Sequence, residues 1–280
     1  MKRQFSLGYL TVLGCPPPEM IYIASRVGYD FVSLRPIYMG LPGEPNFSFA
    51  DNNELMRKTK AALSETGIRL LDIELAKIFD GVEPEKYLSA MESAAELGGK
   101  HVLSSIWTDD RNLAIERFAE LCELAKPFGL TVELEFVPIA SVRDLAGAIE
   151  VLKTAKQENA GLMIDIHHFH RSKDKVEDLD NVPREWFRFL HLCDAVKEIP
   201  DSSEEMTRIL REERLYIGEG GINVASIVNR MPKIPCSIEL PNIKRVEEFG
   251  FEEHSRRCLR SAKEYFEVHL YNDHGVNYTF

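Results

Sequence analysis

Four short apolar runs in this 280-residue sequence end in a side chain that can bind a metal ion or transfer a proton. A carboxylate or an imidazole at the end of a buried strand is costly in free energy unless an opposite charge compensates it. A divalent metal ion shared by several such side chains would supply that charge. We take four residues as its candidate ligands: Glu135, Asp165, His191 and Glu239.

Three carboxylates and one imidazole form a hard, oxygen-rich ligand set, which suits Mn²⁺ or Mg²⁺ best and also admits Co²⁺ or Zn²⁺. Glu135 and Glu239, on opposite sides of a metal-chelated hydroxyketone, could remove and return a proton at the carbon next to the carbonyl. The metal would stabilise the enediolate that forms. These two glutamates are therefore the candidate catalytic residues.

Each candidate also has an ordinary structural interpretation. Asp165 alone could cap a helix, and His191 alone would more often be a core histidine with satisfied hydrogen bonds. His167 is expected to pack rather than to bind a metal. Only one of Glu133 and Glu135 is expected to face the interior of the fold, and Glu135 lies nearer the end of its strand.

Short apolar strands alternate with longer amphipathic segments along the whole chain. Strands are expected at residues 5–9, 31–35, 69–74, 101–104, 130–135, 161–165, 187–191 and 234–239. Helices are expected at about residues 16–27, 51–67 (capped by Asp51), from 84, from 110, after the cap residues Ser141 and Asp144, after 165, and at 250–267. This alternation predicts an α/β fold, a single-domain (β/α)₈ TIM barrel over residues 1–268. Residues 195–221 form a long link after the seventh strand, and residues 269–280 form a C-terminal tail.

The chain carries 34 Lys and Arg against 45 Asp and Glu, a formal net charge of −11. This balance argues against a nucleic-acid partner and against an anionic membrane surface, since both need basic patches. Five cysteines without a Cys-x-x-Cys pair, and an N-terminus without an apolar signal segment, predict a cytoplasmic protein without disulfides. No uncharged run reaches the roughly 18 residues of a membrane span. The tail could dock on a second subunit, which leaves a homo-oligomer open.

The motifs that carry the candidate ligands also carry a family resemblance. They read Leu-Glu-Phe-Val-Pro, Asn-Ala-Gly-Leu-Met-Ile-Asp-Ile-His-His-Phe, Phe-Leu-His-Leu-Cys-Asp-Ala, Gly-Glu-Gly and Ser-Ile-Glu, in this order. The sequence resembles the xylose isomerase-like TIM-barrel superfamily, and within it the sugar phosphate isomerase/epimerase branch, which also holds inosose and 3-dehydroshikimate dehydratases. The resemblance spans nearly the whole chain and is strongest over residues 129–239.

The resemblance implies a metal held by the four candidate ligands and two residues that contact the substrate. His168 would touch a substrate oxygen, and Arg214 stands where dehydratase relatives place a substrate-binding arginine. The sequence also departs from the relatives: Ser141 and Lys197 occupy positions at which ketose 3-epimerases carry glutamate and arginine. Dehydroshikimate dehydratases tend to have glutamine where His191 stands, and an arginine near Lys77.

Three further residues near the ends of the second and third strands could line the mouth of the barrel and bind substrate: Arg35, Glu74 and Lys77. A salt bridge among these three side chains is an equally good interpretation.

Four functions are consistent with these residues to different degrees. The ligand set and the resemblance favour a metal-dependent isomerase or epimerase of a small sugar-like hydroxyketone, phosphorylated or not. A dehydratase that begins with the same enolisation is the alternative, because of Arg214. An endonuclease IV-like DNA-repair enzyme would need more metal-binding histidines and a basic groove. A non-catalytic sugar-binding barrel would leave the buried charges without a use.

Overall fold

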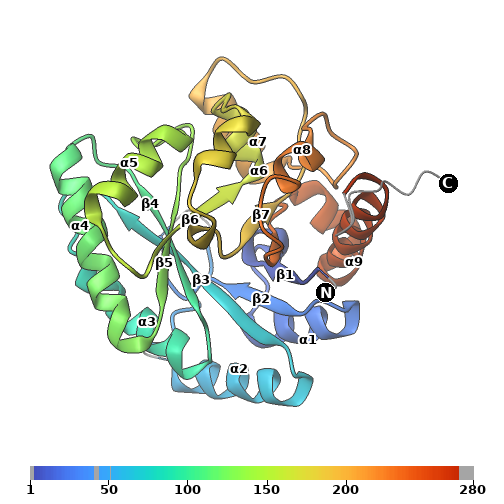
Figure 1. Cartoon of the computed structure of the whole chain (residues 1–280). Helices are drawn as coiled ribbons and strands as arrows, with labels where there is room; N and C mark the ends of the chain where they lie inside the picture. Colours follow the sequence, from blue (N-terminus) through green and yellow to red (C-terminus); the bar gives the residue numbers. More distant parts are fainter. Residues whose placement is uncertain (1–2, 41–43, 51, 271–280) are drawn as a thin grey trace.

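The computed structural model describes residues 3–40, 44–50 and 52–270. Within these residues, eight parallel strands form a closed barrel in which each strand pairs with the next and β8 pairs with β1 (Figure 1). The strands are β1 Phe5–Gly8, β2 Phe31–Leu34, β3 Arg69–Ile78, β4 His101–Ile106, β5 Thr131–Glu135, β6 Ala160–Asp165, β7 Leu190–Leu192 and β8 Cys236–Ile238. The predicted TIM barrel is therefore confirmed, with strand ends shifted by a few residues.

Helices surround the strands, and α9 packs beside α1 (Figure 1). The helices are α1 Pro17–Val27, α2 Asn53–Thr66, α3 Leu88–Glu96, α4 Arg111–Ala125, α5 Leu145–Ala155, α6 Ile166–Arg171, α7 Ser203–Glu212, α8 Val224–Val228 and α9 Ile243–His269. Among the described residues, no helix is both long and apolar enough to cross a membrane.

Side chains at the helix starts explain several of these boundaries. Asp110 and Asp144 accept backbone N–H groups of the first turns of α4 and α5, which ends the preceding loop at a defined residue. Asn52 caps α2 by accepting the Leu55 N–H. The predicted cap, Asp51, lies outside the described residues.

Two segments differ from the sequence prediction. The last helix starts at Ile243 rather than at Gly250, and Gly250 interrupts it with φ 72°, a left-handed value that suits glycine. The link at residues 195–221 contains helix α7, which the sequence prediction missed although its apolar residues Met206, Ile209 and Leu210 have helical spacing. α9 continues through His269, and residues 271–280 of the predicted tail lie outside the described part of the chain.

The barrel has two hydrophobic cores, one between the strands and the helices and one inside the ring of strands. The inner one is a separate buried cluster: Phe31, Leu71, Leu103, Met163 and Phe189. Two residues further along β2, Ser33 lies in a polar layer closer to the C-terminal ends of the strands, where its hydroxyl contacts those of Ser6 and Ser237. The interior is thus apolar at one level and polar just above it.

The register of strand β3 shifts once against β2 and once against β4. Val32 pairs with Leu70, but Ser33 pairs with Asp72, so Leu71 is an extra residue in β3. Such a bulge re-aims the side chains that follow it. Here it brings Asp72 into the interior, where it accepts a hydrogen bond from Ser33.

A buried ion pair crosses the interior below the polar layer. Glu133 on β5 pairs with Arg188 at 3.2 Å and also accepts the Thr131 hydroxyl at 2.6 Å. The pair fits because Gly161, beside Glu133 on β6, has no side chain: a Cβ there would overlap both charged groups.

We predict that Gly161→Ala lowers the free energy of unfolding by about 1–3 kcal/mol, the usual cost of overpacking a filled interior. The added methyl group must push apart the buried carboxylate of Glu133 and the partly buried guanidinium of Arg188. Urea unfolding followed by circular dichroism measures the effect. The control is Gly147→Ala in α5, where the new Cβ would meet the Asp144 carboxylate at 3.3 Å. Equal stabilities of Gly161→Ala and the wild type would contradict the role of this glycine.

Candidate metal centre

The four predicted ligands meet at the C-terminal end of the barrel. Glu135 and Asp165 are the last residues of β5 and β6, His191 lies within β7, and Glu239 follows β8 directly. All four side chains are buried, and one ligand atom of each lies within 4.8 Å of the others. Strands far apart in sequence thus deliver their polar ends to a single point.

The imidazole of His191 points one nitrogen at the three carboxylates. Its Nδ1 lies 3.3 Å from Glu239 Oε2, 3.7 Å from Glu135 Oε1 and 3.9 Å from Asp165 Oδ2. Neither His191 Nδ1 nor Glu135 Oε1 has a hydrogen-bond partner among the described residues. Buried polar atoms that face one another without partners are what a coordinated cation would satisfy.

Arg214 neutralises one of the three carboxylates and so determines the net charge that a cation would have to balance. Its guanidinium is fully buried, and Nη1 donates to Asp165 Oδ2 at 2.7 Å and lies 3.2 Å from Glu239 Oε2. One guanidinium against three carboxylates leaves an excess of two negative charges when His191 is neutral. One divalent ion balances that excess, so the residues fit a divalent metal in both charge and donor type.

The buried charges of the cluster shift the pKa values of its members. Burial raises the pKa of Glu135 well above its usual value, and Glu239 and Asp165 raise it further against the opposing pull of His191. Burial alone would lower the pKa of His191, but Glu239 and the other carboxylates outweigh it and raise this pKa to about 10. Burial likewise opposes ionisation of Glu239, yet His191 and Arg214 hold its pKa at about 2. Without a cation, the cluster therefore binds protons.

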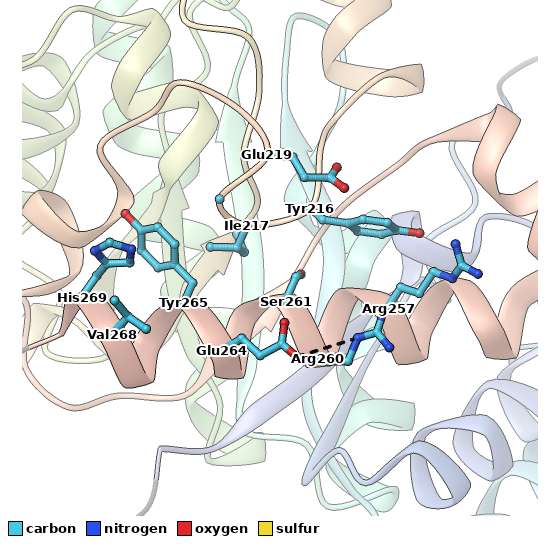
Figure 2. A pocket seen from close by; sticks show the side chains of 11 residues that line it. Tyr216, Ile217, Glu219, Arg257, Arg260, Ser261, Glu264, Tyr265, Val268 and His269 are labelled. Atoms are coloured by element: carbon cyan, nitrogen blue, oxygen red, sulfur yellow. Dashed lines mark ion pairs between the residues drawn. The ribbon is translucent and has the colours of Figure 1, made fainter. Parts of the chain in front are cut away.

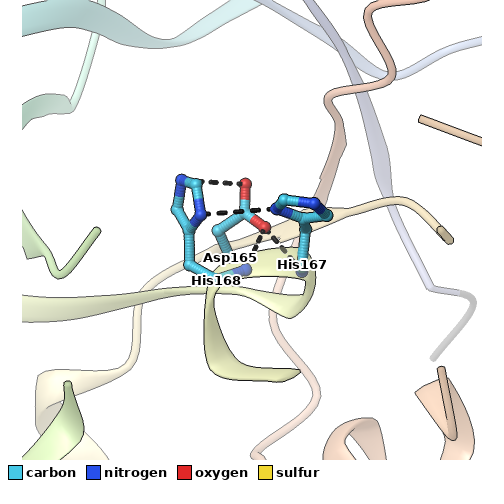
Figure 3. A group of neighbouring side chains, drawn as sticks. All are labelled: Asp165, His167 and His168. Atoms are coloured by element: carbon cyan, nitrogen blue, oxygen red, sulfur yellow. Dashed lines mark hydrogen bonds and ion pairs between the residues drawn. The ribbon is translucent and has the colours of Figure 1, made fainter. Parts of the chain in front are cut away.

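Asp165 caps a helix and also faces the ligand cluster. Its Oδ1 caps α6 by accepting the backbone N–H groups of His167 and His168 (Figure 3). Its Oδ2 faces Arg214 and the ligand cluster. Figure 3 shows the two imidazoles on either side of this carboxylate. Their Nδ1 atoms lie 3.5 Å apart. His167 was expected only to pack, but it is buried and forms a second group of possible metal ligands with Asp165 and His168.

A cavity of about 420 Å³ opens directly above the cluster. Glu135 and Glu239 line it, whereas Asp165 and His191 lie beneath. All five predicted substrate-binding residues line it as well: Arg35, Glu74, Lys77, His168 and Arg214. Its volume lies within the range of about 300–1,000 Å³ that is typical of small-molecule sites.

Arg35 and Glu74 combine the two interpretations that the sequence left open. They form an ion pair at 3.7 Å and both line the cavity. Burial raises the pKa of Glu74 to about 8, although Arg35 opposes this. Lys77 is not part of the pair: its Nζ lies 4.0 Å above the ring of Trp107 on the cavity wall, and burial lowers its pKa.

The prediction that only one of Glu133 and Glu135 faces the interior is wrong. Residues two apart on a strand point to the same face, so both side chains enter the barrel. They differ in height: Glu133 lies lower and is neutralised by Arg188, while Glu135 reaches the cavity.

Asp194 is a structural residue of the site that sequence reasoning missed. Its buried carboxylate accepts the backbone N–H groups of Ala195, Gly218, Gly220 and Ile222 at 2.8–3.1 Å. The Gly-Glu-Gly-Gly segment is thereby folded around a carboxylate. Asp194 also pairs through its backbone with Leu215, which places the preceding Arg214 beside the ligands. Asp194 itself stands in the Leu-Cys-Asp motif, three residues after His191.

A second hollow, of about 470 Å³, lies on the outer surface between residues 216–219 and α9 (Figure 2). Its charged side chains are paired locally, as Arg260 is with Glu264 at 4.0 Å and Arg257 is with Glu253. No group of possible metal ligands among the described residues lines this hollow. The cavity above the cluster is therefore the better candidate site.

Sequence comparison relates the chain to sugar isomerases. A model of the xylose isomerase-like TIM barrel family matches residues 21–262. An inosose isomerase from Bacillus licheniformis is 25% identical over 191 residues, covering 64% of this chain and 66% of the relative, just under two thirds of its length. An inosose isomerase from Bacillus velezensis is 23% identical over 262 residues and covers 86% of this chain and 88% of the relative.

Solved structures share the fold. A structure of the IOLI protein, described with a zinc atom, has a TM-score of 0.77 at 18% identity and covers 95% of this chain and 99% of that one. A probable 3-DHS dehydratase, AsbF from Bacillus anthracis, has a TM-score of 0.71 at 14% identity and covers 93% of this chain and 98% of that one. At these identities the likeness establishes the barrel.

We predict that a divalent metal stabilises the chelator-treated protein and that Asp165→Asn loses most of this effect. A ligand at 100 times its Kd adds about 2.7 kcal/mol, which a melting curve resolves. Asparagine keeps an oxygen to cap α6 but weakens the buried bond to Arg214, so each metal-dependent shift is measured from the metal-free Tm of the same variant. The readout is Tm after EDTA and after addition of Mn²⁺, Mg²⁺, Co²⁺ or Zn²⁺.

The matched control is Glu120→Gln, from an acidic group on the surface that could also attract cations (Glu83, Glu85 and Glu120). Its metal-dependent shift should equal that of the wild type. An equal loss of the shift in both variants, or an unchanged shift in Asp165→Asn, would contradict a metal site at the barrel mouth.

Metal uptake should also release protons at pH 7. The three carboxylates raise the pKa of His191 to about 10, so at pH 7 the metal-free imidazole holds a proton that it must lose to coordinate a metal. Affinity should therefore rise with pH up to the His191 pKa of about 10. Isothermal titration calorimetry in two buffers of different ionisation enthalpy counts the protons. A count of zero, with an affinity that does not depend on pH, would show that the cluster does not bind protons in place of metal.

Proposed function

We propose, since this chain belongs to the xylose isomerase-like TIM barrel family, that it is a metal-dependent isomerase or epimerase of a small sugar-like hydroxyketone. The observation that carries the proposal is the position of Glu135 and Glu239. Both line the substrate-sized cavity, and both belong to the cluster around His191. Glu135 ends β5 and Glu239 follows β8, and β6 and β7 lie between these two strands. The two glutamates therefore approach a bound molecule from different directions.

The reaction follows from this arrangement. A divalent ion held by Glu135, Asp165, His191 and Glu239 would supply a Lewis acid for the carbonyl and hydroxyl oxygens of the substrate. One glutamate removes the proton from the carbon next to the carbonyl. The other returns a proton, to the opposite face for an epimerisation or to the neighbouring carbon for an isomerisation.

Other side chains of the cavity orient the substrate. His168 lies 3.7 Å from Glu135 Oε1, and burial lowers its pKa to about 4, so at neutral pH its uncharged imidazole can hydrogen-bond to a substrate oxygen. Arg35 Nε and Glu74 Oε1 are buried without a hydrogen-bond partner in the described part of the chain. A donor and an acceptor side by side suit a hydroxyl group, which needs both.

The substrate class that we propose is a cyclic or short open-chain polyhydroxy ketone. The names of the two relatives support a cyclic ketone such as an inosose. Apolar side chains on the wall, including Trp107 and Ile139, would pack against the carbon–hydrogen faces of such a ring.

A dehydratase acting on a similar ketone is the second candidate. It would begin with the same proton removal and would then expel a hydroxyl group as water. Arg214 favours this candidate because it lines the cavity at the position where the sequence resemblance places a substrate-binding arginine. Its guanidinium also binds Asp165 and Glu239, so an effect of its substitution on turnover would not separate the two functions.

We predict that Glu135→Gln and Glu239→Gln each lower kcat by about 10²–10⁴-fold, the usual contribution of general acid–base catalysis. The assay incubates an inosose with metal-loaded protein in D₂O and follows deuterium incorporation and product formation by NMR and mass spectrometry. Reversible proton removal next to the carbonyl exchanges that hydrogen for deuterium in either candidate reaction, in the isomerised product or in the recovered substrate. A product of unchanged composition apart from deuterium identifies an isomerase, and the loss of one water identifies a dehydratase.

The control is Glu150→Gln, an exposed residue of α5 paired with Arg111, which should retain wild-type turnover. The metal-dependent Tm shift is measured for every variant, because Glu135 and Glu239 are also candidate ligands. Deuterium incorporation at the wild-type rate in both variants would overturn the assignment of these glutamates.

A further inference from the structure

The ring nitrogen of His191 that faces away from the other candidate metal ligands lacks a hydrogen-bond partner among the described residues. Nδ1 points at the three carboxylates, so Nε2, on the far side of the ring, points away from them. His191 is 1% exposed, and its Nε2 has no hydrogen-bond partner among the described residues. An imidazole that binds a metal through Nδ1 carries its proton on Nε2, and that N–H needs an acceptor.

Asp72 is an acceptor with a free oxygen in the same interior. It is fully buried, and its Oδ1 is used by Ser33. Its Oδ2 has no partner in the described part of the chain. The bulge at Leu71 brings this carboxylate into the barrel interior just below the ligand cluster. Ser33, the partner of Asp72, lies 3.1 Å from Ser237, and Ser237 pairs with His191 on the neighbouring strand, so the serine hydroxyls connect the carboxylate to the level of the imidazole. Burial raises the pKa of Asp72 to about 6, against the opposing charge of His191.

The other polar groups near His191 have contacts or positions that favour other roles. Glu135, Asp165 and Glu239 face Nδ1, on the metal side of the ring. Ser33 and Ser237 contact each other at 3.1 Å. A second buried carboxylate, Glu74, is ion-paired with Arg35 and lines the cavity, so its position favours the substrate.

We infer that Asp72 Oδ2 accepts the Nε2–H of His191 through one bridging water when Nδ1 coordinates a metal. Asp72 is then a positioning residue, which fixes the tautomer of the imidazole and its rotation towards the other ligands. A carboxylate in this place also makes the imidazole a stronger electron donor. The inference rests on the proposed metal-dependent function, because the role of Asp72 is to orient a histidine that binds the metal.

Calorimetric metal binding to the full chain tests the inference, with Mn²⁺ and Zn²⁺ as probes. Asp72→Ala should weaken metal binding by about 10–100-fold, the usual effect of losing an outer partner of a ligating histidine. Asp72→Asn, which keeps a carbonyl acceptor but not the charge, should weaken it less. Two controls accompany these variants: Ser33→Ala removes the partner of Oδ1, and Glu74→Gln neutralises the other buried carboxylate. Both should keep the affinity within about threefold of the wild type.

A second measurement takes its main readout from the wild type. In the Zn²⁺-loaded wild type labelled with ¹⁵N-histidine, NMR should show His191 with its proton on Nε2 and slow exchange of that proton with water. His191→Gln assigns the signal. In Asp72→Asn, the exchange should become faster.

The outcomes separate the inference from the proposed function. If the wild type binds metal and both Asp72 variants match its affinity, or if the His191 proton is on Nδ1, the role of Asp72 is refuted while the metal site stands. A purely structural Asp72 would lower Tm without metal and leave the affinity unchanged, which also refutes the inference. If the wild type binds neither ion, the proposed function and this inference both fail.

Discussion

An excess of two negative charges, buried where the barrel opens, constrains much of this molecule. Three carboxylates from β5, β6 and β8 converge on one imidazole, and Arg214 offsets only one of them. Such a group is unfavourable in a protein interior unless it is paired, protonated or bound to a cation. The segment around Gly218 and Gly220 is held by Asp194, and this arrangement keeps the guanidinium of Arg214 in contact with two of the carboxylates.

The interior of the barrel becomes more polar, level by level, towards the end that carries this charge. The lower level is filled by the apolar cluster around Phe31 and Phe189, and its buried charges, Glu133 and Arg188, neutralise each other. The next level is polar but mostly uncharged, with serine hydroxyls and Asp72. Only the top level carries the unbalanced carboxylates. Polarity thus increases towards the cavity, and the charged atoms that lie there are held on strands rather than on loops, which limits their movement.

The sequence predicted the fold, and it predicted that the four candidate ligands meet, because both depend on local signals. Each strand is an apolar run, and each candidate ligand is the polar residue near its end, so the topology of a parallel barrel brings the four together. Asp72 was not predicted, because its inward direction depends on the bulge at Leu71, and the pairing between β2 and β3 cannot be read from the strand itself. Asp194 was missed for a related reason. Its four donors are backbone groups, three of which lie more than 20 residues away, and they leave no pattern in side-chain types.

The two oxygens of Asp165 connect the site to the backbone of α6. Oδ1 accepts the amide protons of His167 and His168, and Oδ2 contacts Arg214 within the cluster. A carboxylate is a rigid plane, so a rotation that adjusts Oδ2 to a cation also changes the two bonds at Oδ1. The first turn of α6 is therefore mechanically linked to the occupancy of the barrel mouth. The hydrogen-exchange rates of these two amide protons should therefore depend on whether a cation is bound, and they can be measured without any substrate.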